Sequence, residues 1–266
     1  MKRRLGPQES ALLAYVQLRK LAMLHSGDLV GPLRLTPIQE WRLLGRLTRA
    51  GLIARVRPGL YLVPPQLPLG GAWSPNETLA INTLMADRGG RYQICGPSAF
   101  SRYGYDEQVP ARIYAYNNRI SGERRIGAVA LTLIKVADKR LGATEGVQTP
   151  EGLVAVYSSR VRTLVDAVYD WSLFAGLPRA YDWIHSDLAA KRVQAGELVQ
   201  TTLRYGNQGT IRRIGVLLEQ ERVDGRLLRI LAKALKPSTA LIPWIPSAPK
   251  RGTVNRRWGV LVNGRD

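Results

Sequence analysis

The spacing of hydrophobic and polar residues in the first quarter of the chain predicts helices followed by a hairpin. Residues 8–24 carry a wide apolar stripe typical of an amphipathic helix, and residues 26–31 are compatible with one further helical turn. A second helix is predicted over residues 36–50. The short apolar runs 52–57 and 60–63 then read as two strands joined by a tight turn. We therefore expect a small helical core with a two-stranded hairpin at its end.

The helix over residues 36–50 has clear signals at both ends. Thr36 is a good N-cap, Pro37 occupies the first helical position, and Gln39 completes a capping box three residues after the cap. Gly51 provides the stop, because a residue without a Cβ enters the left-handed conformation at low cost. Pro58 and Gly59 suit the two central positions of a type II turn, so they should close the hairpin.

Polar side chains of this helix share one face at about 100° per residue, namely Gln39, Arg42, Arg46 and Arg49. Apolar side chains spread over the rest, and among them are Ile38, Trp41, Leu44 and Leu47. A helix that enters the major groove, followed by a hairpin that touches the flanking backbone, is the winged helix-turn-helix arrangement. We therefore predict that this unit binds double-stranded DNA. The alternative is that the arginines only solvate an amphipathic helix.

The predicted DNA contacts divide into two kinds. Base edges would be read from the start of the helix by Gln39, Arg42 and Arg46, next to the capping Thr36. Phosphates would be held by Arg49 and by the hairpin residues Arg55 and Arg57.

Further along the chain the pattern changes. Prolines and glycines crowd into residues 64–75, which predicts a linker over 67–74 between a winged helix-turn-helix domain at 1–66 and a second domain at 75–266. A helix should start at Ser74, and strands are expected at 92–95, 112–116, 128–136 and 153–157. Helical periodicity then dominates, over residues 161–169, 178–190, 194–205, 210–221 and 225–235, before a final strand at 257–262. The expected fold class is α+β, with an N-terminal winged helix-turn-helix domain followed by a mixed α/β domain that is helix-rich toward its C-terminus.

The charge of the chain favours an anionic partner. Lys and Arg number 39 against 20 Asp and Glu, which gives a formal net charge of +19. Such a field favours nucleic acid, and both ends of the chain are more basic than the middle.

A second basic surface is possible near the C-terminus. Arg226, Arg229, Lys233 and Lys236 repeat the spacing of the first cationic stripe, and Arg212, Arg213, Arg256 and Arg257 could extend it. Lys233 and Lys236 can equally be explained by the helix macrodipole, which cations oppose favourably near a C-terminus. This surface keeps open the alternative of a non-catalytic module that binds RNA or an acidic protein.

Catalytic chemistry finds little support in the sequence. The two histidines, His25 and His185, have no metal-ligand spacing, and no P-loop pattern is present. Cys95 reads as a buried small hydrophobe, and Asp166 with Asp170 as a capping or surface pair. We therefore expect no catalytic residues, no metal site, no cofactor and no enzymatic activity. Without an export signal or an apolar run of about 18 residues, we expect a cytoplasmic protein that does not enter the membrane.

Four motifs in order carry a family resemblance: LTRAGLIARVRPGLYLVP, YQICGPSAFSRYGYDEQVP, VYSSRVRTLVDAVYD, and IRRIGVLLEQ with NRRWGVLVNG. Across nearly the whole chain they resemble the AbiEi family of type IV antitoxins. The resemblance implies a transcriptional repressor that binds repeats in its own operon promoter, with a role in phage defence. It also implies that the C-terminal domain counters a nucleotidyltransferase toxin without forming a stable complex. The DNA-reading helix would be residues 36–50 and the wing residues 52–63. Gly45 in mid-helix and the proline-rich linker depart from the family pattern.

Overall fold

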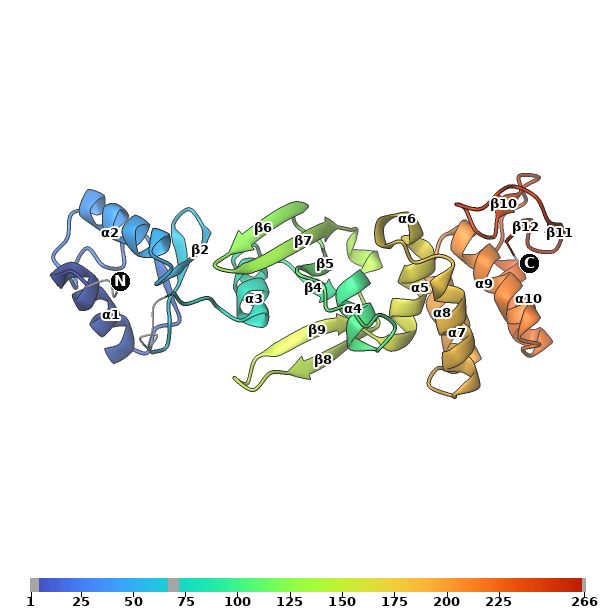
Figure 1. The fold of residues 1–266 in the computed structure, drawn as a ribbon, viewed down its shortest axis with the longest axis horizontal. Helices are drawn as coiled ribbons and strands as arrows, with labels where there is room; N and C mark the ends of the chain where they lie inside the picture. Colours follow the sequence, from blue (N-terminus) through green and yellow to red (C-terminus); the bar gives the residue numbers. More distant parts are fainter. Residues whose placement is uncertain (1–4, 67–71, 265–266) are drawn as a thin grey trace.

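The computed structural model describes residues 5–66 and 72–264, and its fold is mixed α+β as the sequence predicts. Figure 1 shows an elongated molecule with the two termini at opposite ends. A small N-terminal unit, a central sheet and a bundle of helices follow one another along the long axis, and a second small sheet lies at the C-terminal end. None of the helices within these described ranges is long and apolar enough to cross a membrane.

The N-terminal unit combines two helices with a three-stranded antiparallel sheet in the order β1-β3-β2. Its elements are α1 (Pro7–Leu18), β1 (Met23–His25), α2 (Pro37–Arg49), β2 (Ala54–Arg57) and β3 (Leu60–Leu62). The helix predicted over residues 8–24 is therefore wrong in its last quarter. The chain leaves α1 through Lys20 at a φ of 51°, and β1 then pairs with β3 and buries Leu24.

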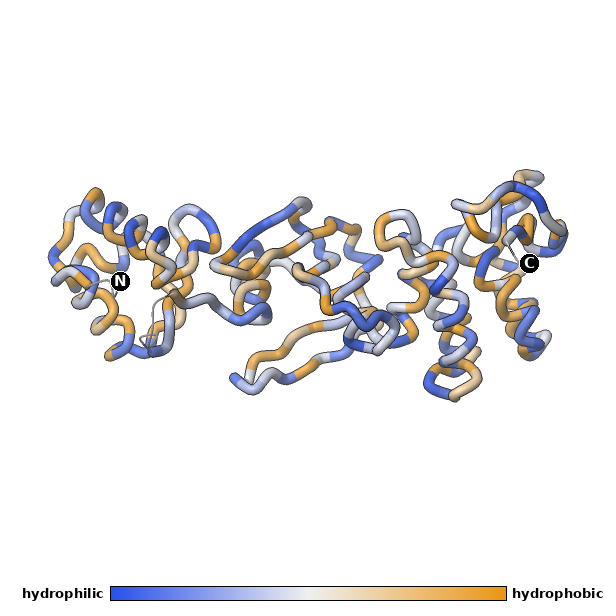
Figure 2. Tube along the Cα trace, viewed as in Figure 1, coloured by the Kyte–Doolittle hydropathy of each residue, from blue (hydrophilic) through white to orange (hydrophobic). Residues whose placement is uncertain are grey.

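The central sheet has six strands in the order β6-β7-β5-β4-β9-β8. They are β4 (Tyr92–Ile94), β5 (Ile113–Asn117), β6 (Gly122–Ile126), β7 (Val129–Lys135), β8 (Thr144–Gln148) and β9 (Val154–Ser158). The four inner strands match the sequence predictions, whereas the edge strands β6 and β8 were not predicted. Both edges are mostly exposed, and β6 is a hydrophilic run beside the more apolar β7 (Figure 2), so neither carries the alternation that marks a half-buried strand.

Two helices belong to this central part, α3 (Glu77–Asp87) and α4 (Gly96–Arg102), and the short helix η1 (Asp138–Arg140) follows β7. The predicted start of α3 at Ser74 is displaced by two residues. Asn76 is the N-cap, because its side chain accepts a hydrogen bond from Leu79 N at 2.7 Å. The Ser74 hydroxyl instead accepts one from Ala128 N at 2.9 Å, which ties the segment before α3 to the β6–β7 turn.

The helical part contains the elements that the periodicity predicts, with boundaries shifted by a residue or two. Its helices are α5 (Arg160–Tyr169), α6 (Trp171–Phe174), α7 (Arg179–Ala189), α8 (Ala195–Tyr205), α9 (Gln208–Gln220) and α10 (Gly225–Lys233). The C-terminal sheet has the order β10-β12-β11, with β10 (Ile242–Pro243), β11 (Thr253–Asn255) and β12 (Val260–Val262). Trp258 is almost fully buried against α9, where it occupies the space that a Cβ on Gly215 would need.

Arginine–carboxylate pairs are buried inside the helical part. Arg162 and Asp166 are completely buried, and Arg162 Nε lies 2.9 Å from both carboxylate oxygens of Asp166. Arg140 donates to the same carboxylate at 3.2 Å. The expectation that Asp166 is a capping or surface residue is therefore wrong. Its charge is buried because two guanidinium groups compensate it.

The hairpin of the N-terminal unit shares a hydrophobic core with the central sheet. Ala54, Val56, Leu60 and Leu62 form one cluster with residues of α3, including Ile81, and with strands β4–β7 and β9. A separate cluster around Leu12, Leu44 and Leu47 forms the core beneath α1 and α2. The hairpin therefore belongs to both units. Of the linker predicted at 67–74, residues 67–71 lie outside the described ranges, and the boundary between domains 1–66 and 75–266 stays a prediction.

Candidate nucleic-acid interface

Helix α2 packs on one side and leaves the other side open. Its buried residues are Glu40, Leu43, Leu44 and Leu47. On the open side, Ile38 and Trp41 are 63% and 70% exposed. The expectation that the apolar residues Ile38 and Trp41 lie away from the cationic face is therefore wrong. They are neighbours of Arg42 on the outward surface.

Two members of the predicted base-reading set are engaged within the N-terminal unit. The Gln39 side chain accepts a hydrogen bond from Thr36 N at 2.8 Å, while Thr36 Oγ1 accepts one from Gln39 N at 3.2 Å, so the predicted capping box is present. Arg46 is half-buried and lies 3.7 Å from the Glu9 carboxylate on α1. Arg42 and Arg49 are exposed and form no ion pair with any described carboxylate. The outward face is thus centred on Arg42 and Arg49, rotated away from Gln39 and Arg46.

A buried carboxylate positions α2 against the segment that precedes it. Glu40 is only 3% exposed and accepts hydrogen bonds from Gly27 N at 2.7 Å and from Leu29 N at 2.9 Å. Residues 26–34 form consecutive turns, so the single helical turn predicted at 26–31 is found as a longer run of turns. Because Glu40 belongs to α2 itself, these bonds fix the angle between the turns and the outward face of the helix.

The two arginines of the hairpin have different environments. Gly59 has a φ of 82°, as the predicted Pro58-Gly59 turn requires. Arg55 is exposed and has no acidic partner among the described residues. Arg57 instead donates two hydrogen bonds to Asp87 at the end of α3, at 2.7 and 2.6 Å. These bonds hold the pKa of the Asp87 carboxyl below its usual range. Arg57 therefore joins the hairpin to α3 and is not available to an external phosphate.

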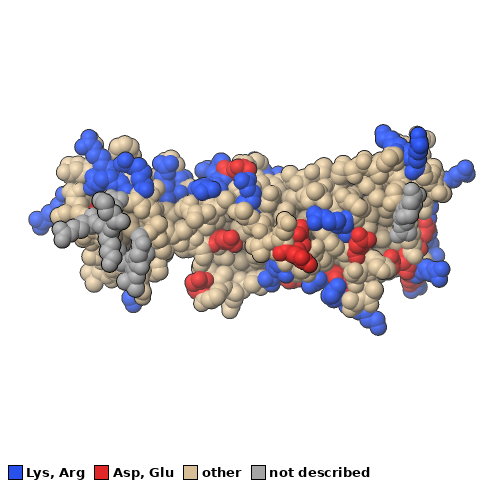
Figure 3. All heavy atoms as spheres, viewed as in Figure 1, with Lys and Arg blue, Asp and Glu red and all other residues tan. Residues whose placement is uncertain are grey.

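A cleft of about 620 Å³ brings together arginines from three elements. Arg49 at the end of α2, Arg55 on β2 and Arg125 on β6 line it. Arg124 and Arg125 on β6 are exposed and, like Arg55, form no ion pair within residues 5–66 and 72–264. Figure 3 shows Lys and Arg side chains along the upper edge of this half, over α2, β2 and β6. We call Arg42, Arg49, Arg55, Arg124 and Arg125 the unpaired arginine surface.

Sequence reasoning missed the β6 part of this surface. The run GERRI has no apolar alternation, so nothing in it indicated a strand, and its distance from α2 in the chain concealed their proximity. The one usable signal was the pair Arg124-Arg125 between two predicted strands. Burial of Ala54 and Val56 beside Ile126 brings that pair to the hairpin.

The predicted second basic surface is reduced by burial. Arg212 and Arg213 are 8% and 7% exposed and donate to the carbonyls of Ala240 and Pro243, so they do not belong to an exposed surface. Arg257 pairs with Glu219 at 2.9 Å. The exposed cations that remain are Arg226, Arg229, Lys233, Lys236 and Arg256.

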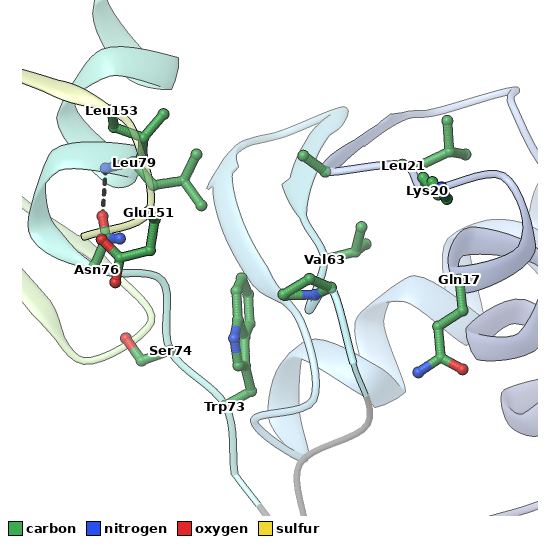
Figure 4. Close-up of a pocket in the computed structure, with 12 residues that line it drawn as sticks. Gln17, Lys20, Leu21, Val63, Trp73, Ser74, Asn76, Leu79, Glu151 and Leu153 are labelled. Carbon is green, nitrogen blue, oxygen red and sulfur yellow. Dashed lines mark hydrogen bonds between the residues drawn. The ribbon is translucent and has the colours of Figure 1, made fainter. Parts of the chain in front are cut away.

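A second cavity of about 620 Å³ lies between the end of α1 and α3 with the β8–β9 turn. Figure 4 shows Trp73 between Val63 on one side and Leu79 and Leu153 on the other, with Lys20 and Glu151 at opposite ends. Trp73 also lines the arginine cleft, and its main-chain N–H donates to Gly51 O at 2.6 Å. The same indole thus separates the apolar cavity from the basic one.

Groups suited to metal binding or nucleophilic catalysis do not gather elsewhere. Within the described residues, no three or more His, Cys, Asp or Glu side chains are placed to hold a metal ion. Cys95 is fully buried, and this burial raises the pKa of its thiol. His25 lies 3.8 Å from Asp28, and His185 lies 2.8 Å from Glu221, both at exposed positions.

Comparison with known proteins gives a match of fold. The sequence matches no protein-family model, and no curated protein is significantly similar to it. The structure is similar to the crystal structure of the RV2827C protein from Mycobacterium tuberculosis, with a TM-score of 0.60 and 16% sequence identity. The match covers 98% of this chain and 92% of that one. The order of all the parts along the molecule is therefore shared with a solved structure.

Proposed function

We propose that the protein is a sequence-specific DNA-binding antitoxin that represses its own operon. The single observation that carries the proposal is the unpaired arginine surface. Cations without carboxylate partners, gathered from α2, β2 and β6, form the kind of surface that the phosphates of a duplex neutralise.

The arrangement of the N-terminal unit supports a winged helix-turn-helix mode of binding. An exposed helix, α2, precedes a hairpin that pairs with a third strand in the order β1-β3-β2. In this mode α2 lies in the major groove and the β2–β3 hairpin is the wing. The turns at residues 26–34 occupy the place of the second helix, and Glu40 holds them against α2.

The antitoxin part of the proposal rests on the resemblance to the AbiEi family. In it, the part of the chain after the wing counters a nucleotidyltransferase toxin without a stable complex, in the cytoplasm and without catalysis by this protein. Co-expression with a nucleotidyltransferase encoded beside the gene tests this directly. We expect growth to be restored while the two proteins fail to co-purify. Continued growth arrest would contradict the antitoxin role.

The DNA-binding role is tested with the full-length protein and overlapping duplexes from the region upstream of its own gene. One duplex should bind more tightly than a shuffled duplex of equal composition. Substituting Arg42→Ala and Arg49→Ala together should cost that duplex about 1–3 kcal/mol for each lost base contact. A matched control, Arg226→Ala with Arg229→Ala, removes two exposed arginines of α10 and should leave the affinity unchanged.

A second candidate is favoured by the exposed cations of α10. Arg226, Arg229 and Lys233 are exposed and form no ion pair among the described residues, which suits binding of RNA or of an acidic protein. The same four-substitution comparison separates the two candidates. If the α10 variant loses nucleic-acid binding and the α2 variant keeps it, the second candidate replaces the first.

A further inference from the structure

The centre of the outward face of α2 has an unusual composition. At about 100° per residue, Ile38, Arg42, Gly45 and Arg49 fall within about 60° of rotation, directly opposite the buried side. Trp41 flanks this sector. The face that points away from the core thus holds two large apolar side chains, two arginines and a glycine, where a solvated helix face would hold short polar and charged residues.

Gly45 has no structural reason inside the protein. A Cβ built on it meets nothing within 4 Å, and its backbone φ is not in the left-handed region. Glycine in a helix interior costs up to about 1 kcal/mol relative to alanine. An open, destabilising glycine on an exposed face is suited to the close approach of another molecule's surface to the helix backbone.

Ile38 and Trp41 indicate what that molecule presents. Their exposed fractions, 63% and 70%, leave much apolar surface in water beside Arg42 and Arg49, which have no described carboxylate partner. The missing partner must therefore offer both negative charge and small apolar groups at close range. The major groove of duplex DNA offers both, because phosphates border it and each thymine projects a C5 methyl group into it.

We propose that Ile38 and Trp41 read thymine C5 methyl groups in the major groove, and that Gly45 allows α2 to approach the bases closely enough for that contact. The inference rests on the proposed DNA-binding function and adds to it the chemistry of base selection. Arg42 and Arg49 hold the duplex by charge, while the apolar pair discriminates between bases.

Thymine-to-uracil replacement tests the methyl contact, since uracil lacks only the methyl group. The full-length protein first selects its preferred duplex from a randomised library, and that duplex is then synthesised with uracil at each thymine in turn. Wild type should bind about fourfold more weakly for each contacted methyl lost, the factor expected for burying one such group. Ile38→Ala and Trp41→Ala should each remove the discrimination at one or more positions. Ile230→Ala, at an exposed apolar position of α10, should keep it.

Gly45→Ala tests the close approach. The substitution should raise the midpoint of thermal unfolding, because alanine favours the helix, yet weaken binding to the selected duplex about tenfold, the scale of one lost base contact. Gly196→Ala is the control. Gly196 lies in α8 with equally open space around it, so its substitution should leave binding unchanged.

Three results would overturn the inference. If uracil duplexes bind wild type as tightly as thymine duplexes, the methyl contact is absent. If Gly45→Ala binds like wild type, the close approach is absent. Both results leave sequence selection intact and so leave the proposed function standing. If the library yields no preferred duplex at all, the DNA-binding function itself fails along with the inference.

Discussion

Arginine serves two purposes in the two halves of this molecule. In the helical half, guanidinium groups end on carboxylates. Arg162 and Arg140 meet Asp166, and Arg160 and Arg192 meet Asp187, whose side chain has no exposed surface. On the face formed by α2, β2 and β6, the guanidinium groups of the unpaired arginine surface meet no described carboxylate. A net charge of +19 does not distinguish these uses. The presence or absence of a carboxylate partner does.

The difference has a physical basis. Two buried charges stabilise a fold only when each compensates the other, so a buried arginine requires a carboxylate nearby. An exposed arginine has no such requirement, and a cluster of them repels itself until an anion arrives. Residues of the first kind determine how the helical half packs, and those of the second kind leave a surface prepared for a polyanion.

The largest effect should come from breaking a pair in the helical half. Asp166→Ala leaves Arg162 buried without its carboxylate, and we expect a loss of about 3–5 kcal/mol in the free energy of unfolding, measured by urea denaturation. Asp182→Ala, at an exposed position of α7, is the control and should change stability by less than about 0.5 kcal/mol. A small loss for Asp166→Ala would mean that the buried pair contributes little to this fold.

The next effect concerns the support of α2. Glu40→Ala removes the acceptor for Gly27 N and Leu29 N, and hydrogen bonds to a charged group are worth about 1.5–3 kcal/mol each. We expect a loss of at least about 2 kcal/mol, with the turns at residues 26–34 exchanging amide hydrogens faster than α1. Unchanged exchange in that segment would show that other contacts position it.

Removing charge from β6 should leave stability alone and change salt dependence. Arg124→Ala with Arg125→Ala takes two cations from an exposed strand, so the free energy of unfolding should move by less than about 0.5 kcal/mol. If the duplex reaches β6, the slope of log affinity against log salt should fall by about 0.9 per lost phosphate contact. An unchanged slope on a long duplex would restrict the interface to α2 and the wing.

The smallest effect lies at the junction of the two halves. Because Arg57 lowers the pKa of Asp87, this pair stabilises the fold above the ordinary pKa of an aspartate, near 4, and the contribution disappears as the pH falls through the lowered value. Asp87→Asn should therefore be less stable than wild type at pH 7, with the gap closing in acid. Urea denaturation at both pH values measures it. A gap that persists in acid would point to packing instead of charge.

Much of the fold follows from local patterns. Helices α5, α7, α8 and α9 have strong periodicity, and Thr36 with Gln39 forms the capping box that their spacing predicts. Edge strands such as β6 lack such a pattern, because both of their faces meet water. The helix over residues 8–24 failed because pairing with β3 took its last residues into a strand, and pairing of that kind is invisible in a local window.

The candidate site was less predictable than the fold, for a related reason. The outward face of α2 depends on Glu40 being buried, and a carboxylate is not expected in a core until its two amide donors are known. Arg57 has its partner thirty residues away on α3, and Arg125 reaches the cleft only through the shared core. Type and spacing identified arginines of interest, whereas long-range contacts decided which of them remain free.

The shared core beneath the wing limits how this protein could be recombined with others. An exchange of the N-terminal unit at the linker would strip Ala54, Val56, Leu60 and Leu62 of the α3 and sheet residues that cover them, and would leave Arg57 without Asp87. The smallest transferable reading head therefore includes α3 and its sheet contacts. Changes of DNA specificity in this architecture are accordingly easier to achieve by substitution on the outer face of α2 than by swapping whole modules.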